Sequence, residues 1–172
     1  MIEYERTYLA KYVPTDLGQC RSKEIIDVYI PVTSEHPKLR LRKNGDNYEM
    51  TKKQPVTGKD SSEQEEQTII LTEEEFKALA KIEGKKVHKI RYVYPFNGGL
   101  AEIDVFQGPL KGLVLIDVEF PSREENDAFA MPDFCLSDVT QEKTFAGGML
   151  CGKSLDDIKH GLDRYGYKVI MV

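Results

Sequence analysis

Short stretches that alternate charged and apolar residues with a period of two recur along the chain, and within each stretch the charges have one sign. Five are regular and one is looser: 2–5, 39–42, 89–92, 102–105 and 116–120, with 50–53 as the looser one. Because a β-strand sends alternate side chains to opposite faces, each stretch predicts a strand with two like charges on one face. Such pairs repel and destabilise the strand unless water solvates them or an opposite charge neutralises them. Their repetition on several strands therefore predicts a charged interior.

Strand signals cover most of the chain. We expect strands over 1–9, 25–30, 38–43, 47–54, 63–71, 86–95, 99–106, 113–120 and 167–172. The segments 44–47 (Asn-Gly-Asp-Asn) and 97–99 (Asn-Gly-Gly) are typical of tight turns between antiparallel strands. The order of strands and turns therefore predicts an antiparallel meander.

Helices are few and begin at capping boxes. Thr72, Ser122 and Ser154 each precede an acidic residue by three positions, which predicts helices that end near residues 82, 129 and 162. A weaker pattern predicts a fourth helix over 15–24. With no linker or repeat in the chain, we expect one α+β domain over 1–172 that is mainly antiparallel β.

The separation of charge signs bears on whether the sheet is open or closed. In an open sheet with one solvated face, the charged rows would simply face water. Solvated faces usually mix basic and acidic residues, however, because opposite charges on neighbouring strands stabilise the sheet. Whole strands of one sign favour a closed barrel with a charged lumen, whose apolar outer face is covered by helices and loops.

Composition narrows the classes of partner and compartment. The 172 residues are 40% hydrophobic and 31% charged, with a net charge of −5 and no long basic run, so duplex nucleic acid is not an expected partner. Three widely spaced cysteines argue against a disulfide framework and favour a reducing cytoplasm. The charged N-terminal strand predicts no signal peptide, and the short apolar runs predict no membrane span. The oligomeric state stays open.

The charged rows suggest a chemistry. Five cations on three or four strands suit a di- or triphosphate better than a lone carboxylate, because arginine forks match phosphate oxygens. They are Arg40, Arg42, Lys53, Lys89 and Arg91. The paired acids offer hard oxygen ligands for Mg²⁺ or Mn²⁺, which polarise a phosphoryl oxygen and orient a water. These pairs are Glu3/Glu5, Glu102/Asp104 and Asp117/Glu119. The alternative is a set of internal salt bridges in a ligand-free barrel, at a desolvation cost of several kcal/mol per ion.

One segment matches a nucleotide-binding motif in the wrong context. Residues 147–154 fit the P-loop pattern G-x-x-x-x-G-K-S. A P-loop follows a buried apolar strand, whereas 141–146 is polar, and only 18 residues follow Ser154. We therefore expect Ser154 to be a helix N-cap.

Six motifs along the chain, and a closing segment after them, resemble the CYTH superfamily, also called triphosphate tunnel metalloenzymes, over nearly the whole chain. Residues 2–9 (IEYERTYL) resemble its Glu-x-Glu-x-Lys strand, and 50–55 (MTKKQP) its Leu-Thr-x-Lys-Gly-Pro hairpin. The basic strands lie at 39–42 and 89–92, the acidic strands at 102–106 and 117–121, and the closing segment at 139–145.

The resemblance implies an eight-stranded tunnel-like barrel, a divalent cation (Mg²⁺ or Mn²⁺) and a small molecule that bears a triphosphate. It assigns metal binding to Glu3, Glu5, Asp117 and Glu119, and also to Glu102 and Asp104; it assigns phosphate binding to Arg40, Arg42, Lys53, Lys89 and Arg91. Glu5, Glu119 and Lys53 would be catalytic. A further acidic strand falls near 61–66, and the resemblance adds Glu63 and Glu65 from it to the metal ligands. Glu63 and Glu65 share one face and Gln64 and Glu66 the other, so its register stays open.

The chain departs from the family pattern at three places. Thr7 replaces the lysine of the first motif, the arginine expected near Ser61 is missing, and the closing segment has Glu142 and Phe145 where Asp and Tyr are usual. We expect a metal-dependent hydrolase of inorganic or nucleoside triphosphate, slowed by Thr7. The alternatives are a class IV adenylate cyclase, which would make cyclic AMP from ATP, and a non-catalytic module that binds polyphosphate or nucleotide.

Overall fold

A computed structural model describes residues 2–57 and 60–172. Its strands are β1 (Ile2–Ala10), β2 (Arg21–Ile30), β3 (Leu39–Asn44), β4 (Asn47–Pro55), β5 (Glu63–Leu71), β6 (Lys85–Phe96), β7 (Gly99–Phe106), β8 (Val114–Phe120) and β9 (Cys135–Asp138). Its α-helices are α1 (Glu73–Leu79), α2 (Arg123–Ala128), α3 (Gly147–Leu150) and α4 (Lys159–Asp163). Short 3-10 turns cover Leu17–Gln19, Gly108–Leu110, Lys143–Phe145 and Asp156–Ile158. Residue 1, which the sequence prediction placed in the first strand, lies outside the described residues.

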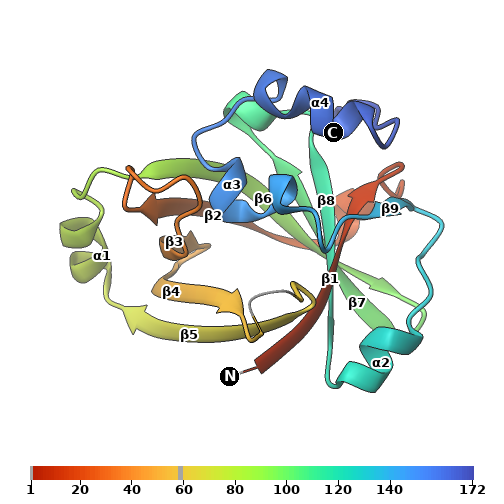
Figure 1. Ribbon diagram of the computed structural model, residues 1–172, viewed down its shortest axis with the longest axis horizontal. Helices are drawn as coiled ribbons and strands as arrows, with labels where there is room; N and C mark the ends of the chain where they lie inside the picture. Colours follow the sequence, from red (N-terminus) through yellow and green to blue (C-terminus); the bar gives the residue numbers. More distant parts are fainter. Residues whose placement is uncertain (1, 58–59) are drawn as a thin grey trace.

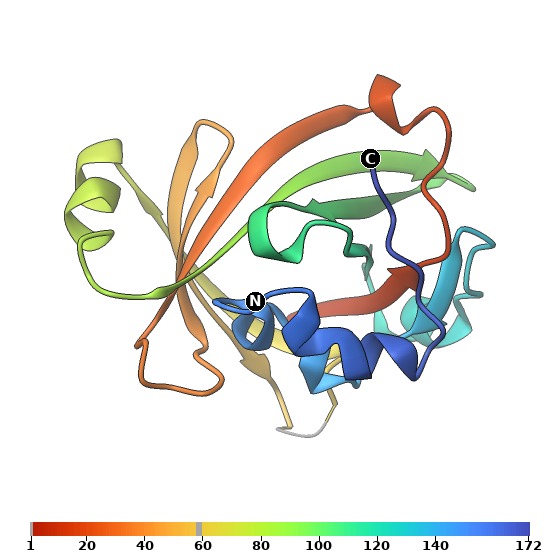
Figure 2. The same ribbon diagram turned by 90° about the horizontal axis from the view of Figure 1, so that it is seen from above.

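The strands form one antiparallel sheet that closes on itself (Figures 1 and 2). Neighbouring strands follow the order β5-β4-β3-β2-β6-β7-β8-β1-β9, and an additional pairing of β5 with β1 closes the barrel. That seam joins Ile2–Tyr4 to Glu63–Glu65. The predicted closed, eight-stranded antiparallel barrel is confirmed, with β9 as an extra strand that pairs with the end of β1.

Local sequence signals produce the hairpins and the first helix. The β3–β4 turn holds Gly45 at φ 61°, and the β6–β7 turn holds Asn97 at φ 45° and Gly98 at φ 79°, a backbone region that favours glycine and asparagine. At the start of α1, Thr72 and Glu75 form both hydrogen bonds of a capping box. Ser122 likewise accepts a hydrogen bond at the start of α2.

Two predicted elements are wrong. The segment 15–24 is a 3-10 turn at Leu17–Gln19 followed by β2, because pairing with β6 begins as early as Arg21. The segment 167–172 is extended but pairs with no strand; Ile170 donates a backbone hydrogen bond to Gly112, and the Tyr167 hydroxyl donates to the same carbonyl. Tyr167 and Ile170 pack onto the core instead, whereas Val169, Met171 and Val172 are exposed.

The apolar core has two parts that together leave the lumen polar. Outward-facing residues of β1, β7 and β8, such as Tyr8, Ile103 and Ile116, pack in one cluster with Phe134 and Cys135 from the chain around β9. The second cluster joins lumen-facing residues at one end of the barrel to side chains of the C-terminal segment. Its members include Tyr29, Val87, Phe106 and Leu115 from the strands, and Phe145, Leu150, Ile158 and Leu162 from beyond residue 139. The C-terminal segment thus closes this end of the barrel.

Two adjacent glycines allow that closure. A Cβ on Gly147 would lie 2.3 Å from the Tyr29 hydroxyl oxygen, and a Cβ on Gly148 would lie 2.4 Å from the Pro37 carbonyl oxygen. The backbone of α3 therefore packs directly on β2 and on the loop after it. These are the glycines of the P-loop-like sequence, and their role in the fold is close packing. The Ser154 backbone and hydroxyl donate to the Asp157 carboxylate, but the N-cap of the 3-10 turn Asp156–Ile158 is Leu155, so the predicted N-cap is placed one residue too early.

None of the helices in the described residues has the length and apolar character needed to cross a membrane.

Candidate active site

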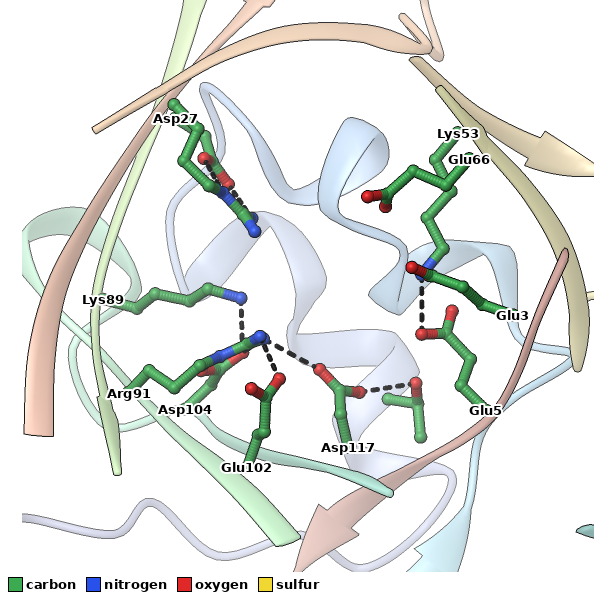
Figure 3. Close-up of polar contacts among 12 residues, drawn as sticks. Glu3, Glu5, Asp27, Lys53, Glu66, Lys89, Arg91, Glu102, Asp104 and Asp117 are labelled. Carbon is green, nitrogen blue, oxygen red and sulfur yellow. Dashed lines mark hydrogen bonds and ion pairs between the residues drawn. The ribbon is translucent and has the colours of Figure 1, made fainter. Parts of the chain in front are cut away.

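A single cavity of about 840 Å³ lies inside the barrel and takes side chains from all eight barrel strands and from the segment 139–150. Eleven of the residues that the sequence singled out line it: Glu3, Glu5, Arg40, Arg42, Lys53, Lys89, Arg91, Glu102, Asp104, Asp117 and Glu119. The period of two brings them together, because all of them lie on the inward face of their strands. Figure 3 shows many of them pointing from opposite walls into a common space, with the C-terminal segment behind.

One wall of the cavity carries a buried network of opposite charges (Figure 3). Both oxygens of Asp104 accept hydrogen bonds from Arg91, at 2.7 Å from Nε and 2.6 Å from Nη2, and Lys89 donates to the same carboxylate. Arg91 also bonds Glu102 and lies 3.2 Å from Asp117. Burial would raise the pKa of Asp104, but Arg91 and Lys89 outweigh it and hold that pKa well below its ordinary range. Asp104 thus fixes the two cations in place.

A second buried pair, Asp27 with Arg42, lies on the same side. Arg42 donates to both Asp27 oxygens, at 2.7 Å from Nε and 2.8 Å from Nη2, and Asp27 is only 1% exposed. Arg42 keeps the pKa of Asp27 below its ordinary value despite burial. Asp27 does not stand out in the sequence, because no like charge follows or precedes it at a spacing of two.

The opposite wall is acidic and holds three glutamates close together. One carboxylate oxygen from each of Glu3, Glu5 and Glu119 lies within 4.8 Å of the others. The Lys53 ammonium lies 2.9 Å from Glu3 and 2.7 Å from Glu5. Burial, helped by repulsion from the acids around them, raises the pKa of both Glu5 and Glu119, although Lys53 opposes the shift. Three mutually repelling oxygen donors fit the preference of a hard divalent cation.

Asp117 lies between the two walls rather than in the group of three glutamates. Its Oδ1 accepts a 2.7 Å hydrogen bond from the Thr7 hydroxyl, and its Oδ2 lies 3.2 Å from Arg91. Thr7 lines the cavity, whereas Arg6 points outward and donates to Asn126 at 2.7 Å. Position 7 therefore has the inward orientation that strand alternation predicts.

The register of the acidic strand β5 is now determined. Gln64 and Glu66 line the cavity, and Glu66 lies opposite Lys53 and 3.8 Å from Arg40. Glu63 instead pairs with Arg123 at 2.8 Å, and neither Glu63 nor Glu65 lines the cavity. The metal-side assignment of Glu63 and Glu65 is therefore wrong. Pairing with β1 places Gln64 opposite Glu3, and only this tertiary register decides which face points inward.

Two known proteins of similar sequence are both inorganic triphosphatases. No family model matches the chain. An inorganic triphosphatase from Nitrosomonas europaea is 34% identical over 146 residues, which are 84% of this chain and 93% of that protein. An inorganic triphosphatase from Acetivibrio thermocellus is 34% identical over 64 residues, or 37% of this chain and 40% of that protein.

Solved structures show the same fold. A crystal structure of an inorganic triphosphatase superposes with a TM-score of 0.63 at 30% identity and covers 88% of this chain and 95% of its own. A putative adenylate cyclase from Bacillus halodurans gives a TM-score of 0.54 at 15% identity and covers 99% of this chain and 92% of its own. At that identity the second likeness concerns the fold alone.

Proposed function

The chain belongs to the CYTH superfamily of triphosphate tunnel metalloenzymes, and on that premise we propose that it hydrolyses inorganic triphosphate or a nucleoside triphosphate with the help of a divalent cation. The observation that carries the proposal is one cavity with three clustered carboxylates on one wall and fixed cations on the other. The name of the 34% identical relative supports inorganic triphosphate as the first substrate to test.

The acidic wall is the proposed metal side. Glu3, Glu5 and Glu119 would hold Mg²⁺ or Mn²⁺, with Asp117, Glu102 and Asp104 as further carboxylates of the cavity. When bound, such an ion supplies Lewis-acid polarisation of a phosphoryl oxygen and an oriented water. Lys53 lies against two of the three glutamates, so it would neutralise them and reach the phosphate that they face.

The basic side would bind and orient the phosphates. Arg40, Arg42, Lys89 and Arg91 offer donors at fixed positions, since Asp27 and Asp104 hold three of them by buried ion pairs. Phosphoryl transfer depends mainly on positioning and charge neutralisation, so no covalent nucleophile is needed. Glu5, Glu119 and Lys53 would be the catalytic residues, because they lie where metal, water and phosphate would meet.

A phosphate-release screen tests this function. Triphosphate, ATP, GTP and thiamine triphosphate are incubated with Mg²⁺, with Mn²⁺ and with EDTA, and the nucleotide products are then analysed. We expect orthophosphate from triphosphate with a divalent cation and none in EDTA. Cyclic AMP from ATP would instead support the cyclase, and tight metal-dependent binding without turnover would support the binding module.

Variants at the acidic wall locate the chemistry. Glu5→Gln and Glu119→Gln keep the side-chain shape but remove charge, so each should lower kcat/KM roughly a hundredfold or more. Glu124→Gln, on the exposed face of α2, is the matched control and should leave the rate unchanged. Undiminished turnover in both cavity variants, or in EDTA, would contradict the assignment.

A further inference from the structure

A group of three basic residues lies at the edge of the cavity beyond the cations already assigned. His36, Lys38 and Lys143 all line it, next to the Gly147–Gly148 backbone of α3. Lys38 directly precedes β3 and continues the inward row of Arg42 and Arg40. Because residues two apart on a strand are about 6.6 Å apart, the row from Arg42 to Lys38 is about 13 Å long.

Lys38 and Lys143 differ from the other Lys and Arg residues that line the cavity, because each of those forms an ion pair with a carboxylate. The Lys38 ammonium lies 3.2 and 3.3 Å from the two ring nitrogens of His36. Among residues 2–57 and 60–172, no carboxylate forms an ion pair with Lys38 or Lys143. The nearby cavity-lining acid, Glu142, is turned toward Arg164 at 3.4 Å.

The side chains of the group are close enough to repel one another. Burial and then the charge of Lys143 lower the pKa of Lys38. Burial, Lys38 and Lys143 together lower the pKa of His36. His36 and Lys38 are half-buried, and Lys143 is exposed at the mouth of the cavity. Positive charges that lie together without an ion-paired carboxylate are stabilised when an anion binds between them.

The loop that carries His36 and Lys38 is held in place. A Cβ on Gly148 would lie 2.4 Å from the Pro37 carbonyl oxygen and 2.7 Å from His36 Cδ2, so the α3 backbone is in direct contact with this loop. Pro37 itself is buried. His36 and Lys38 therefore lie on a supported wall of the cavity, which lowers the entropy cost of binding a ligand there.

We propose that His36, Lys38 and Lys143 form an additional phosphate subsite, which accepts the fourth phosphoryl group of a linear inorganic polyphosphate. The inference rests on the proposed function, in which the first three phosphates would bind between Lys53 and the Arg40–Arg42 row. The subsite lies at the end of that row, where Lys38 and Lys143 have no carboxylate to displace. It makes the protein selective for chains longer than triphosphate.

Binding of triphosphate and tetraphosphate, measured by calorimetry with Mg²⁺, tests the subsite. Lys38→Gln and Lys143→Gln should each weaken tetraphosphate binding about tenfold and leave triphosphate within twofold. The matched control is Lys159→Gln, whose side chain pairs with Asp163 on the outer surface, and it should change neither affinity. Equal losses for both ligands, or no loss for either, would overturn the proposal.

Parallel hydrolysis assays separate this inference from the proposed function. If the wild type binds both ligands but releases no phosphate, hydrolysis fails while the affinity ratio still decides the subsite. If the wild type hydrolyses triphosphate and the two lysine variants keep its tetraphosphate-to-triphosphate affinity ratio, the subsite alone is refuted. Binding of neither ligand refutes both.

Discussion

Among single residues, Asp27 holds Arg42 in a buried, two-bond ion pair. Removing one partner of such a pair leaves an uncompensated buried charge, so Asp27→Ala should lower the free energy of unfolding by about 3–5 kcal/mol. Urea denaturation measures this loss of stability. Asp127→Ala is the control, because Asp127 is exposed and forms only a loose ion pair with Arg123, at 3.9 Å. A loss of less than about 1 kcal/mol, the scale of a surface pair, would show that Arg42 does not depend on Asp27.

The same carboxylate gives a pH dependence of defined sign. Its pKa in the folded protein lies below the ordinary value of 3.8. A carboxylate with a lowered pKa stabilises the fold above its unfolded pKa, and this contribution is lost as pH falls through the folded pKa. The stability difference between wild type and Asp27→Asn should therefore be constant above pH 3.8 and shrink below it. Denaturant titrations over this range measure the difference, and a gap that widens in acid would contradict the expectation.

Thr7 is the residue whose replacement should change the rate. Its hydroxyl reaches Asp117 from inside the cavity, so a lysine there would place an ammonium beside the acids and the phosphates. Charge that develops in the transition state would gain one preorganised partner, and Thr7→Lys should raise kcat about tenfold or more with a smaller change in KM. Steady-state kinetics measure both constants.

Two comparisons make the Thr7 experiment decisive. Thr7→Val keeps the shape and removes only the hydrogen bond to Asp117, so it should not raise kcat. Rapid hydrolysis by the wild type, together with an unchanged or lower kcat in Thr7→Lys, would show that another cation already supplies the missing charge.

For the secondary-structure elements, the packing of α3 against β2 and its loop gives a graded prediction. Gly148→Ala would bring a Cβ to 2.4 Å from a backbone oxygen, whereas Gly147→Ala would meet the end of the Tyr29 side chain, which can move. We expect Gly148→Ala to cost about 1–3 kcal/mol and Gly147→Ala less. Gly18→Ala is the control, because a Cβ there would meet nothing within 4 Å. Thermal or urea unfolding of the three variants should give this order, and equal costs would contradict it.

Elements with local signals could be predicted from the sequence. The charged rows, the glycine and asparagine turns and the capping boxes each depend on residues a few positions apart, so the barrel strands and α1 were located correctly. The four-residue strand β9 has no periodic pattern, and it forms because its backbone pairs with the end of β1. The 15–24 and 167–172 segments were misassigned because pairing with β6 and packing on the core decide their conformations.

The candidate site shows the same limit. Residues in like-charge rows, such as Arg40/Arg42 and Glu3/Glu5, were singled out and line one cavity. Asp27 and the His36–Lys38 pair were missed, and the register that turns Glu66 inward stayed open, since each depends on a neighbour on another strand or loop. The periodic pattern within one strand does not show which side chains of another strand or loop it will contact.

For the whole molecule, the balance of charge in the cavity predicts how ligands bind. The described residues that line it include nine Asp or Glu and seven Lys or Arg side chains, so acids exceed bases by two. A triphosphate adds further negative charge, which a divalent cation would offset. We expect Mg²⁺ and triphosphate together to raise the melting temperature by more than the sum of their separate effects.

A thermal-shift series with each ligand alone and with both measures this coupling. Glu5→Gln and Glu119→Gln should weaken it, because each removes a proposed metal ligand. An equal rise with triphosphate alone would show that the basic residues bind the anion without a cation.

The position of β1 also affects how the chain is made. All strands that pair with β1 come later in the chain: they are β5, β8 and β9, and Thr7 contacts Asp117, which lies 110 residues further on. Such distant pairings form slowly, so β1 stays unpaired until the later strands are available. An apolar strand in that position would invite aggregation, whereas like charges at alternate positions resist it. We therefore expect Glu3 and Glu5 to limit aggregation of the unfolded chain, in addition to lining the cavity of the folded protein.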